Sequence, residues 1–217
     1  ELLGPDRLID QAQTFGFNAT PPIDLPGAVP SRFPTEFGEE LRPPSFEVPA
    51  GVFEDTPALA QAAIGQNDVS ATPLQMALAV AAVANDGEIM EPHVVGEVRN
   101  LAGSAVSTVS PGVWQRPLSP GVARDLQIAM INVVENGTAS SVNIDGLVVG
   151  AKTGTAQLGT DPPQSHAWMV AFAGPVGGEA ELAIAVLLEG NEGAAEQTGG
   201  RVAGPIARAL IEAYFAE

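Results

Sequence analysis

Residues 150–157 read Gly-Ala-Lys-Thr-Gly-Thr-Ala-Gln, and this stretch decides how the rest of the sequence is interpreted. Lys152, the only lysine in the chain, follows a short apolar run that begins at Leu147 and predicts a strand. A lysine at the end of a strand can hold a carboxylate or lower the proton affinity of a nearby hydroxyl. Thr153 and Thr155 occupy alternate positions, so their hydroxyls share one face and can bind the same carboxylate.

Gly154 lies between the two threonines and carries no side chain, so a substrate can lie against the strand edge there. The backbone N–H of Thr155 can then help to stabilise an oxyanion. A surface lysine flanked by turn residues is the alternative, because so short a motif often occurs by chance. The surrounding sequence has to distinguish the two interpretations.

The residues after this motif predict the rest of a sheet and a closing helix. Residues 167–174 and 182–188 each alternate, and a Gly-Pro-Val-Gly-Gly turn at 174–178 lies between them, which predicts an antiparallel hairpin. An apolar stripe at helical spacing then predicts a helix that covers one face of the sheet. The residues of this stripe are Ile206, Ala209, Leu210 and Ala213.

The middle of the chain contains a strong helix start. Thr72 can cap a helix with Pro73 at its first position, and Gln75 stands where a capping-box partner belongs. The alanine-rich residues 74–83 continue this helix and are apolar all round, which is typical of a buried helix. The other predicted elements are helices at 2–15 and 119–136 and short strands at 93–98 and 105–109.

Residues 20–57 hold nine of the 19 prolines. Proline disrupts helix interiors and central strands, so we expect a long irregular segment there.

The composition excludes several classes of protein. The net charge of −17 repels phosphate backbones, so nucleic-acid binding is not expected. Cysteine is absent, which removes disulfides, thiolate zinc sites and cysteine nucleophiles. His93 and His166 are far apart and lack metal-ligand spacing, so no metal site is expected.

Several motifs together resemble the transpeptidase domain of class B penicillin-binding proteins. Residues 150–157, preceded by Asn-Gly-Thr-Ala at 136–139, are similar to the third signature of that family. The other similar segments, in the family's order, are residues 3–8, 15–17, Gly-Gln at 65–66, Thr-Pro-Leu-Gln-Met at 72–76 and the strand at 166–173. Within the family, the proline-rich insert and the overall pattern are most similar to the actinobacterial subgroup called PbpA.

The resemblance implies a mixed α/β fold of the α+β type, with an antiparallel sheet flanked by helices, as in penicillin-binding proteins and serine β-lactamases. Residues 1–217 are expected to be the C-terminal portion of a single transpeptidase domain. Residues 146–217 would then supply the last three strands and the terminal helix of a five-stranded sheet. The strand at 182–188 would lack its neighbour, so we expect the isolated chain to be marginally stable or to associate through that edge.

One family motif is missing from this sequence. The family's nucleophile lies in Ser-x-x-Lys, and because Lys152 is the sole lysine, the motif would require serine where Val149 stands. Ser141-Val142-Asn143 matches the second motif, Ser-x-Asn, but the family places that motif upstream of the helix that opens this chain. We interpret residues 141–143 as a polar loop and expect this chain alone to be inactive.

The resemblance implies that the parent protein is a serine-type peptidoglycan D,D-transpeptidase that acts on D-Ala-D-Ala stem peptides and binds β-lactams. It assigns Lys152 to electrostatic assistance, Thr153, Gly154 and Thr155 to substrate binding, and the N–H of Thr155 to the oxyanion hole. No metal or organic cofactor is implied. The implied setting is cell-wall synthesis for division or shape, at the extracytoplasmic face of the plasma membrane, with an upstream anchor and a membrane-embedded glycosyltransferase partner.

Two other functions stay open: a non-catalytic divisome or elongasome scaffold module, and a β-lactam sensor or β-lactamase relative. The run from Gly-Gln at 65–66 to Gln-Met at 75–76 disfavours the second of these. His166 and Trp168 share a strand face and are candidates to line the cleft, although plain packing explains them equally well. Ser165 and His166 are neighbours whose side chains diverge, and no Gly-x-Ser-x-Gly elbow exists, so a separate Ser-His-Asp site is not expected.

Overall fold

The computed structural model describes residues 4–43, 51–161, 163–190 and 198–216. Parts of the predicted first helix (Leu2, Leu3), of the irregular segment (44–50) and of the C-terminal region (162, 191–197, 217) lie outside the described residues. The elements are α1 (Pro5–Thr14), β1 (Glu40–Arg42), β2 (Val52–Phe53), α2 (Thr56–Ala62), α3 (Pro73–Ala84), β3 (Ile89–Met90), β4 (Glu97–Arg99), β5 (Ala105–Thr108), β6 (Val113–Gln115), α4 (Pro120–Asn136), the short 3-10 helix η1 (Ser140–Val142), β7 (Leu147–Gln157), β8 (Ser165–Pro175), β9 (Leu182–Leu188) and α5 (Gly199–Phe215).

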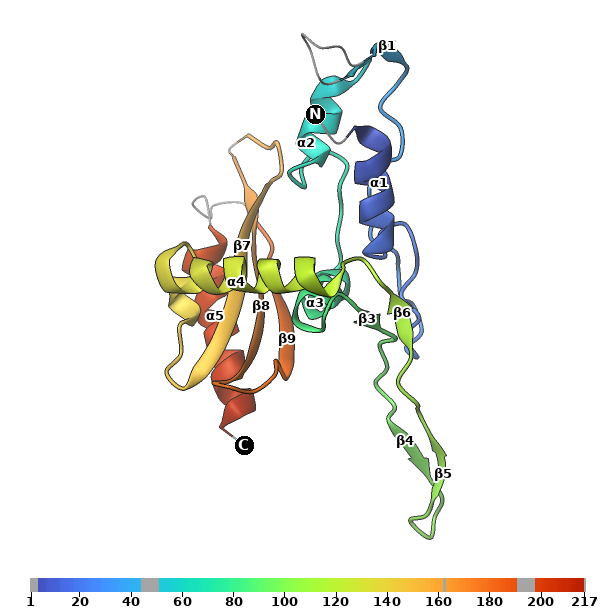
Figure 1. Ribbon diagram of the computed structural model, residues 1–217, viewed down its shortest axis with the longest axis vertical. Coiled ribbons are helices and arrows are strands. Elements are labelled where there is room, and N and C mark those ends of the chain that lie inside the picture. The colour runs from blue at the N-terminus through green and yellow to red at the C-terminus, as the bar shows by residue number, and fades with distance from the viewer. Residues whose placement is uncertain (1–3, 44–50, 162, 191–197, 217) are drawn as a thin grey trace.

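An antiparallel sheet in the order β7–β8–β9 organises the C-terminal half (Figure 1). β7 and β8 pair along their whole length, with Lys152 opposite Val170 and Gly154 opposite Trp168. The predicted strands and their antiparallel pairing are therefore confirmed. β7 is longer than expected, because its ladder with β8 continues to Gln157. Lys152 consequently lies inside the strand and not at its end.

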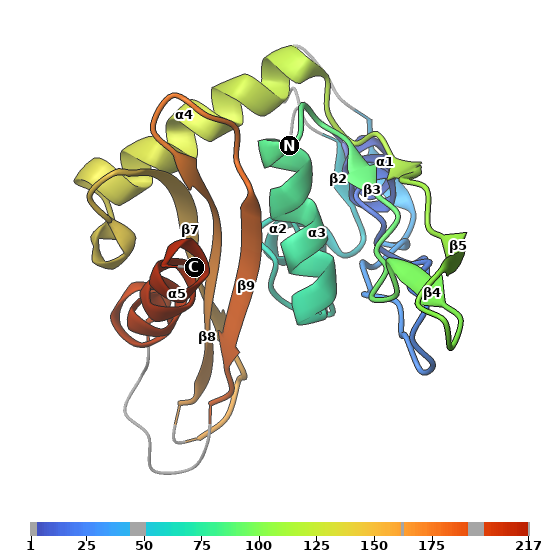
Figure 2. The ribbon, with the colours of Figure 1, turned by 90° about the horizontal axis from the view of Figure 1, so that it is seen from below.

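Helices cover both faces of this sheet (Figure 2). On one face Phe172 packs with Val80 and Val83 of α3, together with side chains of α4. On the other face Met169 belongs to the core shared with α5, where Ile211 is fully buried. The alternation expected for residues 167–174 is thus present, since side chains of successive residues point to opposite faces.

The terminal helix α5 forms, but its predicted buried face is wrong. Ile206 and Leu210 are 43% and 50% exposed, and Ala209 and Ala213 are exposed as well. The buried residues are Gly199, Ala203, Gly204, Ala207 and Ile211. Small residues occupy this inner face because the helix lies close to its neighbours: a Cβ atom at Gly204 would be 2.1 Å from the hydroxyl of Ser141.

α3 begins as predicted, since the Thr72 hydroxyl accepts the N–H of Gln75 at 3.1 Å. Gln75 does not complete a capping box, however. Its Nε2 donates instead to the carbonyl oxygen of Phe15 at 2.6 Å, and the side chain is fully buried. The glutamine therefore joins the end of α1 to α3, because an unpaired carbonyl inside the protein would be costly.

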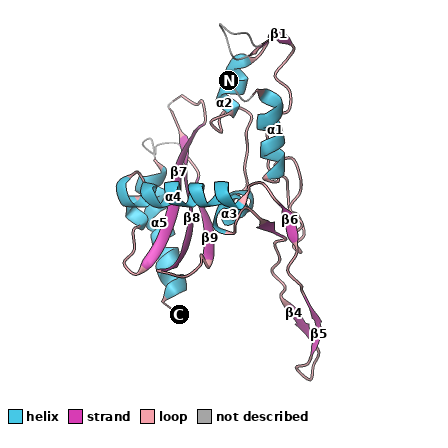
Figure 3. Cartoon of the chain, in the orientation of Figure 1, coloured by secondary structure: helices cyan, strands magenta, loops and turns pink. Residues whose placement is uncertain are grey.

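The N-terminal half is less regular (Figure 3). Phe33, Phe37 and Ala62 form a small core with residues of α1 and α2, and α2 was not predicted from the sequence. Strands β4 and β5 form an antiparallel hairpin that extends away from the rest of the molecule (Figure 1). No helix within the described residues has both the length and the apolar character needed to cross a bilayer.

Candidate active site

The Lys-Thr-Gly motif lies on β7, an outer strand of the described sheet. Lys152 is exposed, and its ammonium group donates to the carbonyl oxygen of Thr153 at 2.5 Å. Thr153 and Thr155 are half-buried and pair with Met169 and Ala167. Paired residues of an antiparallel ladder share a face, so both threonines lie on the α5 side and Lys152 on the side of α3 and α4.

The hydroxyl of Thr153 is held by a second threonine. Thr138, in the segment between α4 and η1, places its Oγ1 atom 2.8 Å from Oγ1 of Thr153. Either hydroxyl can donate, and when Thr138 donates, the O–H of Thr153 remains available to donate to a ligand. The segment at 136–139 is part of the family resemblance, but its contact with Thr153 was not predicted from the sequence.

The start of α5 sits directly on the motif strand. A Cβ atom at Gly199 would be 2.0 Å from the carbonyl oxygen of Trp168 and 2.7 Å from that of Gly154. One at Gly200 would be 2.2 Å from the carbonyl oxygen of Thr138. Glycine is required at both positions because the helix approaches the strand backbone more closely than any side chain allows.

Gly154 has a close neighbour, Trp168, on the face of the sheet opposite to α5. A Cβ atom there would lie 3.2 Å from Cβ of Trp168, its cross-strand partner, which is a tight contact. The glycine therefore relieves crowding against Trp168 and also leaves the strand free of a side chain between the two threonines.

A side chain from outside the sheet also reaches the motif. Gln66, which lies between α2 and α3, donates from Nε2 to the carbonyl oxygen of Thr155 at 3.1 Å. The two residues are 89 positions apart in sequence. The Gly-Gln pair at 65–66 is part of the family resemblance, yet no local pattern indicates which residue it contacts.

His166 and Trp168 lie on the same face of the sheet as Lys152, because they pair with Ala156 and Gly154. Both are half-buried. The Nδ1 atom of His166 accepts the backbone N–H of Gly190 at 3.0 Å. This contact places the proton of the neutral ring on Nε2 and fixes the ring beside the end of β9.

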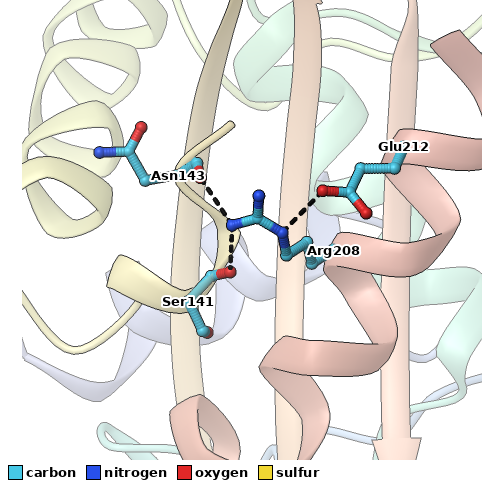
Figure 4. Close-up of polar contacts among 4 residues, drawn as sticks. All are labelled: Ser141, Asn143, Arg208 and Glu212. Carbon is cyan, nitrogen blue, oxygen red and sulfur yellow. Dashed lines mark hydrogen bonds and ion pairs between the residues drawn. The ribbon is translucent and has the colours of Figure 1, made fainter. Parts of the chain in front are cut away.

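Ser141 and Asn143, the literal match to Ser-x-Asn, direct their backbone carbonyl groups toward Arg208 of α5, while the side chain of Asn143 points away from that helix (Figure 4). The Ser141 hydroxyl donates to the carbonyl oxygen of Gly200 at 3.2 Å. Arg208 donates to the carbonyl oxygens of Ser141 and Asn143 at 3.4 and 2.8 Å and also bonds Glu212. These contacts tie the segment to the last helix and support its interpretation as a structural element.

A cavity of about 840 Å³ lies elsewhere, between α3, α4 and the turn from β8 to β9. Its lining includes Asp86, Glu88, Glu91 and His93, and none of the motif residues. Among the residues that the structure describes, no three His, Asp or Glu side chains are grouped so as to hold a metal ion.

Comparison with known proteins identifies relatives along almost the entire chain. Residues 1–212 match the family described as penicillin binding protein transpeptidase domain. Peptidoglycan D,D-transpeptidase PbpA of Mycolicibacterium smegmatis is 37% identical over 216 residues, which are 99% of this chain and 40% of that protein. The protein of the same name from Mycobacterium tuberculosis is 36% identical over 212 residues, covering 97% of this chain and 39% of its own length. The chain thus spans well under half of these relatives.

Solved structures agree with this result. Penicillin-binding protein A from M. tuberculosis, as an imipenem acyl-enzyme complex, superposes with a TM-score of 0.76 at 33% identity over 97% of this chain and 42% of that one. The D,D-transpeptidase domain of a peptidoglycan glycosyltransferase from Eggerthella lenta superposes with a TM-score of 0.75 at 27% identity, over 99% of this chain and 49% of that one. The predicted fold class, helices around an antiparallel sheet, is confirmed.

Proposed function

This chain belongs to the penicillin-binding protein transpeptidase family, and from that premise we propose that it supplies the Lys-Thr-Gly side of a peptidoglycan D,D-transpeptidase site. The position of the motif carries the proposal: Lys152, Thr153 and Thr155 lie on an outer strand, where a substrate can reach them. The names of the relatives, which are peptidoglycan D,D-transpeptidases, support it.

The proposed reaction begins with a serine that is not among these 217 residues, because the sequence contains no Ser-x-x-Lys. The serine oxygen bonds to the carbonyl carbon of a D-Ala-D-Ala unit, and its proton passes to the departing amine as the terminal D-alanine leaves. The amine of a second stem peptide then attacks the acyl-enzyme. Its nitrogen takes the acyl group, and the serine regains a proton.

The residues of this chain act on the charges of that reaction. The ammonium group of Lys152 provides positive charge near the reacting hydroxyl, and the hydroxyls of Thr153 and Thr155 bind the terminal carboxylate. The N–H of Thr155 donates to the oxyanion. β-Lactams take the place of the substrate, and the imipenem acyl-enzyme complex of the M. tuberculosis relative supports this part of the proposal.

The proposed setting follows from the same family. The whole protein works at the extracytoplasmic face of the plasma membrane, held by a segment outside this sequence, and cooperates with a membrane-embedded glycosyltransferase. His166 and Trp168 line the cleft on the Lys152 side, which their shared strand face supports.

Intact-mass spectrometry after incubation with benzylpenicillin tests the proposal. We expect an adduct on the full-length protein and none on this chain alone, because the nucleophile lies outside it. A Lys152→Ala variant of the full-length protein should acylate far more slowly. An adduct on the isolated chain would contradict the assigned nucleophile, and no adduct on either would favour a non-catalytic scaffold.

A further inference from the structure

Gln66 contacts the motif strand at the residue that the proposed function assigns to the oxyanion. Its Nε2 atom donates to the Thr155 carbonyl oxygen at 3.1 Å, and the contact is partly buried. We propose that Gln66 is a positioning residue of the D,D-transpeptidase site, which holds the outer edge of β7 in the geometry that catalysis requires. The inference rests on the proposed function and names a part of that site outside the Lys-Thr-Gly strand.

The backbone around Gln66 has an unusual conformation. Gly65 and Asn67, on either side of it, both have positive φ angles, 75° and 60°. Glycine adopts this region readily, whereas asparagine does so at a cost, and such residues persist where the surroundings determine them. Two left-handed residues in three form a tight bend that presents the intervening side chain to β7.

The bond to Thr155 constrains more than one atom. In an antiparallel ladder the N–H and C=O groups of a residue point to the same side. Since β7 is an outer strand of the described sheet and Gln66 approaches from outside that sheet, the N–H of Thr155 points to the same edge as the carbonyl that Gln66 holds. Fixing the carbonyl therefore also fixes the direction of the N–H.

Direction matters because an oxyanion donor has to lie within a narrow distance of the developing charge. A strand edge with no neighbouring strand has freedom to move by local opening. One hydrogen bond from the side-chain amide of Gln66, which lies in a separate part of the chain, restricts that movement before the substrate arrives. Gln66 thus contributes to stabilisation of the transition state by orienting Thr155, without touching the substrate.

The amide group is essential to this role. A glutamine Nε2–H donates to a carbonyl, whereas an ionised carboxylate in its place has only acceptors and would repel the carbonyl oxygen. A protonated carboxyl group regains one donor. Gln66→Glu therefore converts the proposed contact into one that depends on pH.

The test uses the full-length protein and follows acylation by benzylpenicillin, separating initial binding from the acylation step. Gln66→Ala should slow the acylation step about fivefold with little change in initial binding, as expected for the loss of one hydrogen bond. Gln61→Ala is the matched control, because Gln61 is an exposed glutamine at the end of α2. Its acylation rate should equal that of the wild type.

Gln66→Glu gives the decisive readout. The ratio of its acylation rate to that of the wild type should rise toward one as the pH falls, because protonation restores a donor to Thr155. A merely structural contact would give a ratio that follows thermal stability and not pH. Wild-type rates in Gln66→Ala, or a pH-independent ratio in Gln66→Glu, would overturn the inference while leaving the proposed function intact. A wild-type protein that is not acylated would contradict both the proposed function and the role of Gln66.

Discussion

The hydroxyl of Thr153, which the proposed function assigns to the substrate carboxylate, is bound to the hydroxyl of Thr138 at 2.8 Å. A hydroxyl that is already paired on one side has fewer orientations available, so less entropy is lost when it binds a ligand. Gly200 leaves room for this arrangement, because a Cβ atom there would be 3.3 Å from the methyl group of Thr153. The chemistry of the motif thus depends on residues that precede and follow the strand.

Replacing Thr138 with valine should weaken β-lactam binding to the full-length protein about threefold to fivefold, since one hydroxyl contact is lost at constant shape. Thr138→Ser retains the hydroxyl and should behave like the wild type. Competition with a fluorescent penicillin measures both. Wild-type binding in Thr138→Val, with a loss only in Thr138→Ser, would show that the methyl group matters and not the hydroxyl.

Among the secondary-structure elements, α5 shows how close packing selects small residues. Ala203 and Ala207 are fully buried, whereas the larger Ile206 and Leu210 remain exposed on the outer side. Hydrophobicity alone assigns the wrong face, because distance to the sheet limits side-chain volume before apolarity matters.

Ala207→Leu should lower the free energy of unfolding by about 1–3 kcal/mol, because added methyl groups cannot be accommodated in a filled core. Ala209→Leu, two positions away on the exposed side, should change it by less than about 0.5 kcal/mol. Equilibrium urea unfolding compares the two. A larger decrease in the free energy of unfolding for Ala209→Leu than for Ala207→Leu would indicate that the face predicted from the sequence is the buried one.

The base of the β4–β5 hairpin is held by Asp24, from the irregular N-terminal segment. Its carboxylate accepts the backbone N–H groups of Val94 and Val95 at 2.8 and 3.0 Å, from Oδ1 and Oδ2. These two bonds hold the pKa of Asp24 below its ordinary value of 3.8.

Because the pKa of Asp24 is lowered in the folded state, its stabilising contribution is present above the ordinary pKa and is lost as the pH falls through the lowered value. The amide proton shifts of Val94 and Val95, measured by NMR, should change with a midpoint below the ordinary pKa of 3.8. Asp24→Asn should abolish that change. Asp68→Asn, which changes an exposed aspartate elsewhere in the chain, should leave the pH-dependent shift change of Val94 and Val95 in place.

At the scale of the whole molecule, the described sheet has two outer strands with different surroundings. β7 receives Gln66 and the start of α5 at its motif. β9 packs on its face against α3 and α5, while no described strand pairs with its outer edge. An apolar strand with an open edge is a site for pairing with another chain.

We therefore expect this 217-residue chain, prepared alone, to associate as its concentration rises, which analytical ultracentrifugation detects. Leu101→Asp is the control, because Leu101 at the end of the hairpin is fully exposed and offers an alternative contact. Association should persist in that variant. A monomeric chain that unfolds cooperatively would contradict the expectation.

The sequence alone determined the elements that depend on local patterns. Alternation at 167–174 and 182–188 predicted β8 and β9, Thr72-Pro73 predicted the start of α3, and the single lysine excluded Ser-x-x-Lys. These signals lie within a few residues of one another, so the chain carries them before it folds.

Only the tertiary structure decided which distant groups meet. Gln75 resembles a capping-box residue locally but binds Phe15, 60 positions away, and Gln66 binds Thr155 across 89 positions. The inner face of α5 likewise followed from its distance to the sheet. Such choices depend on the volume left between packed elements and on which buried polar groups still need partners, and no short segment contains that information.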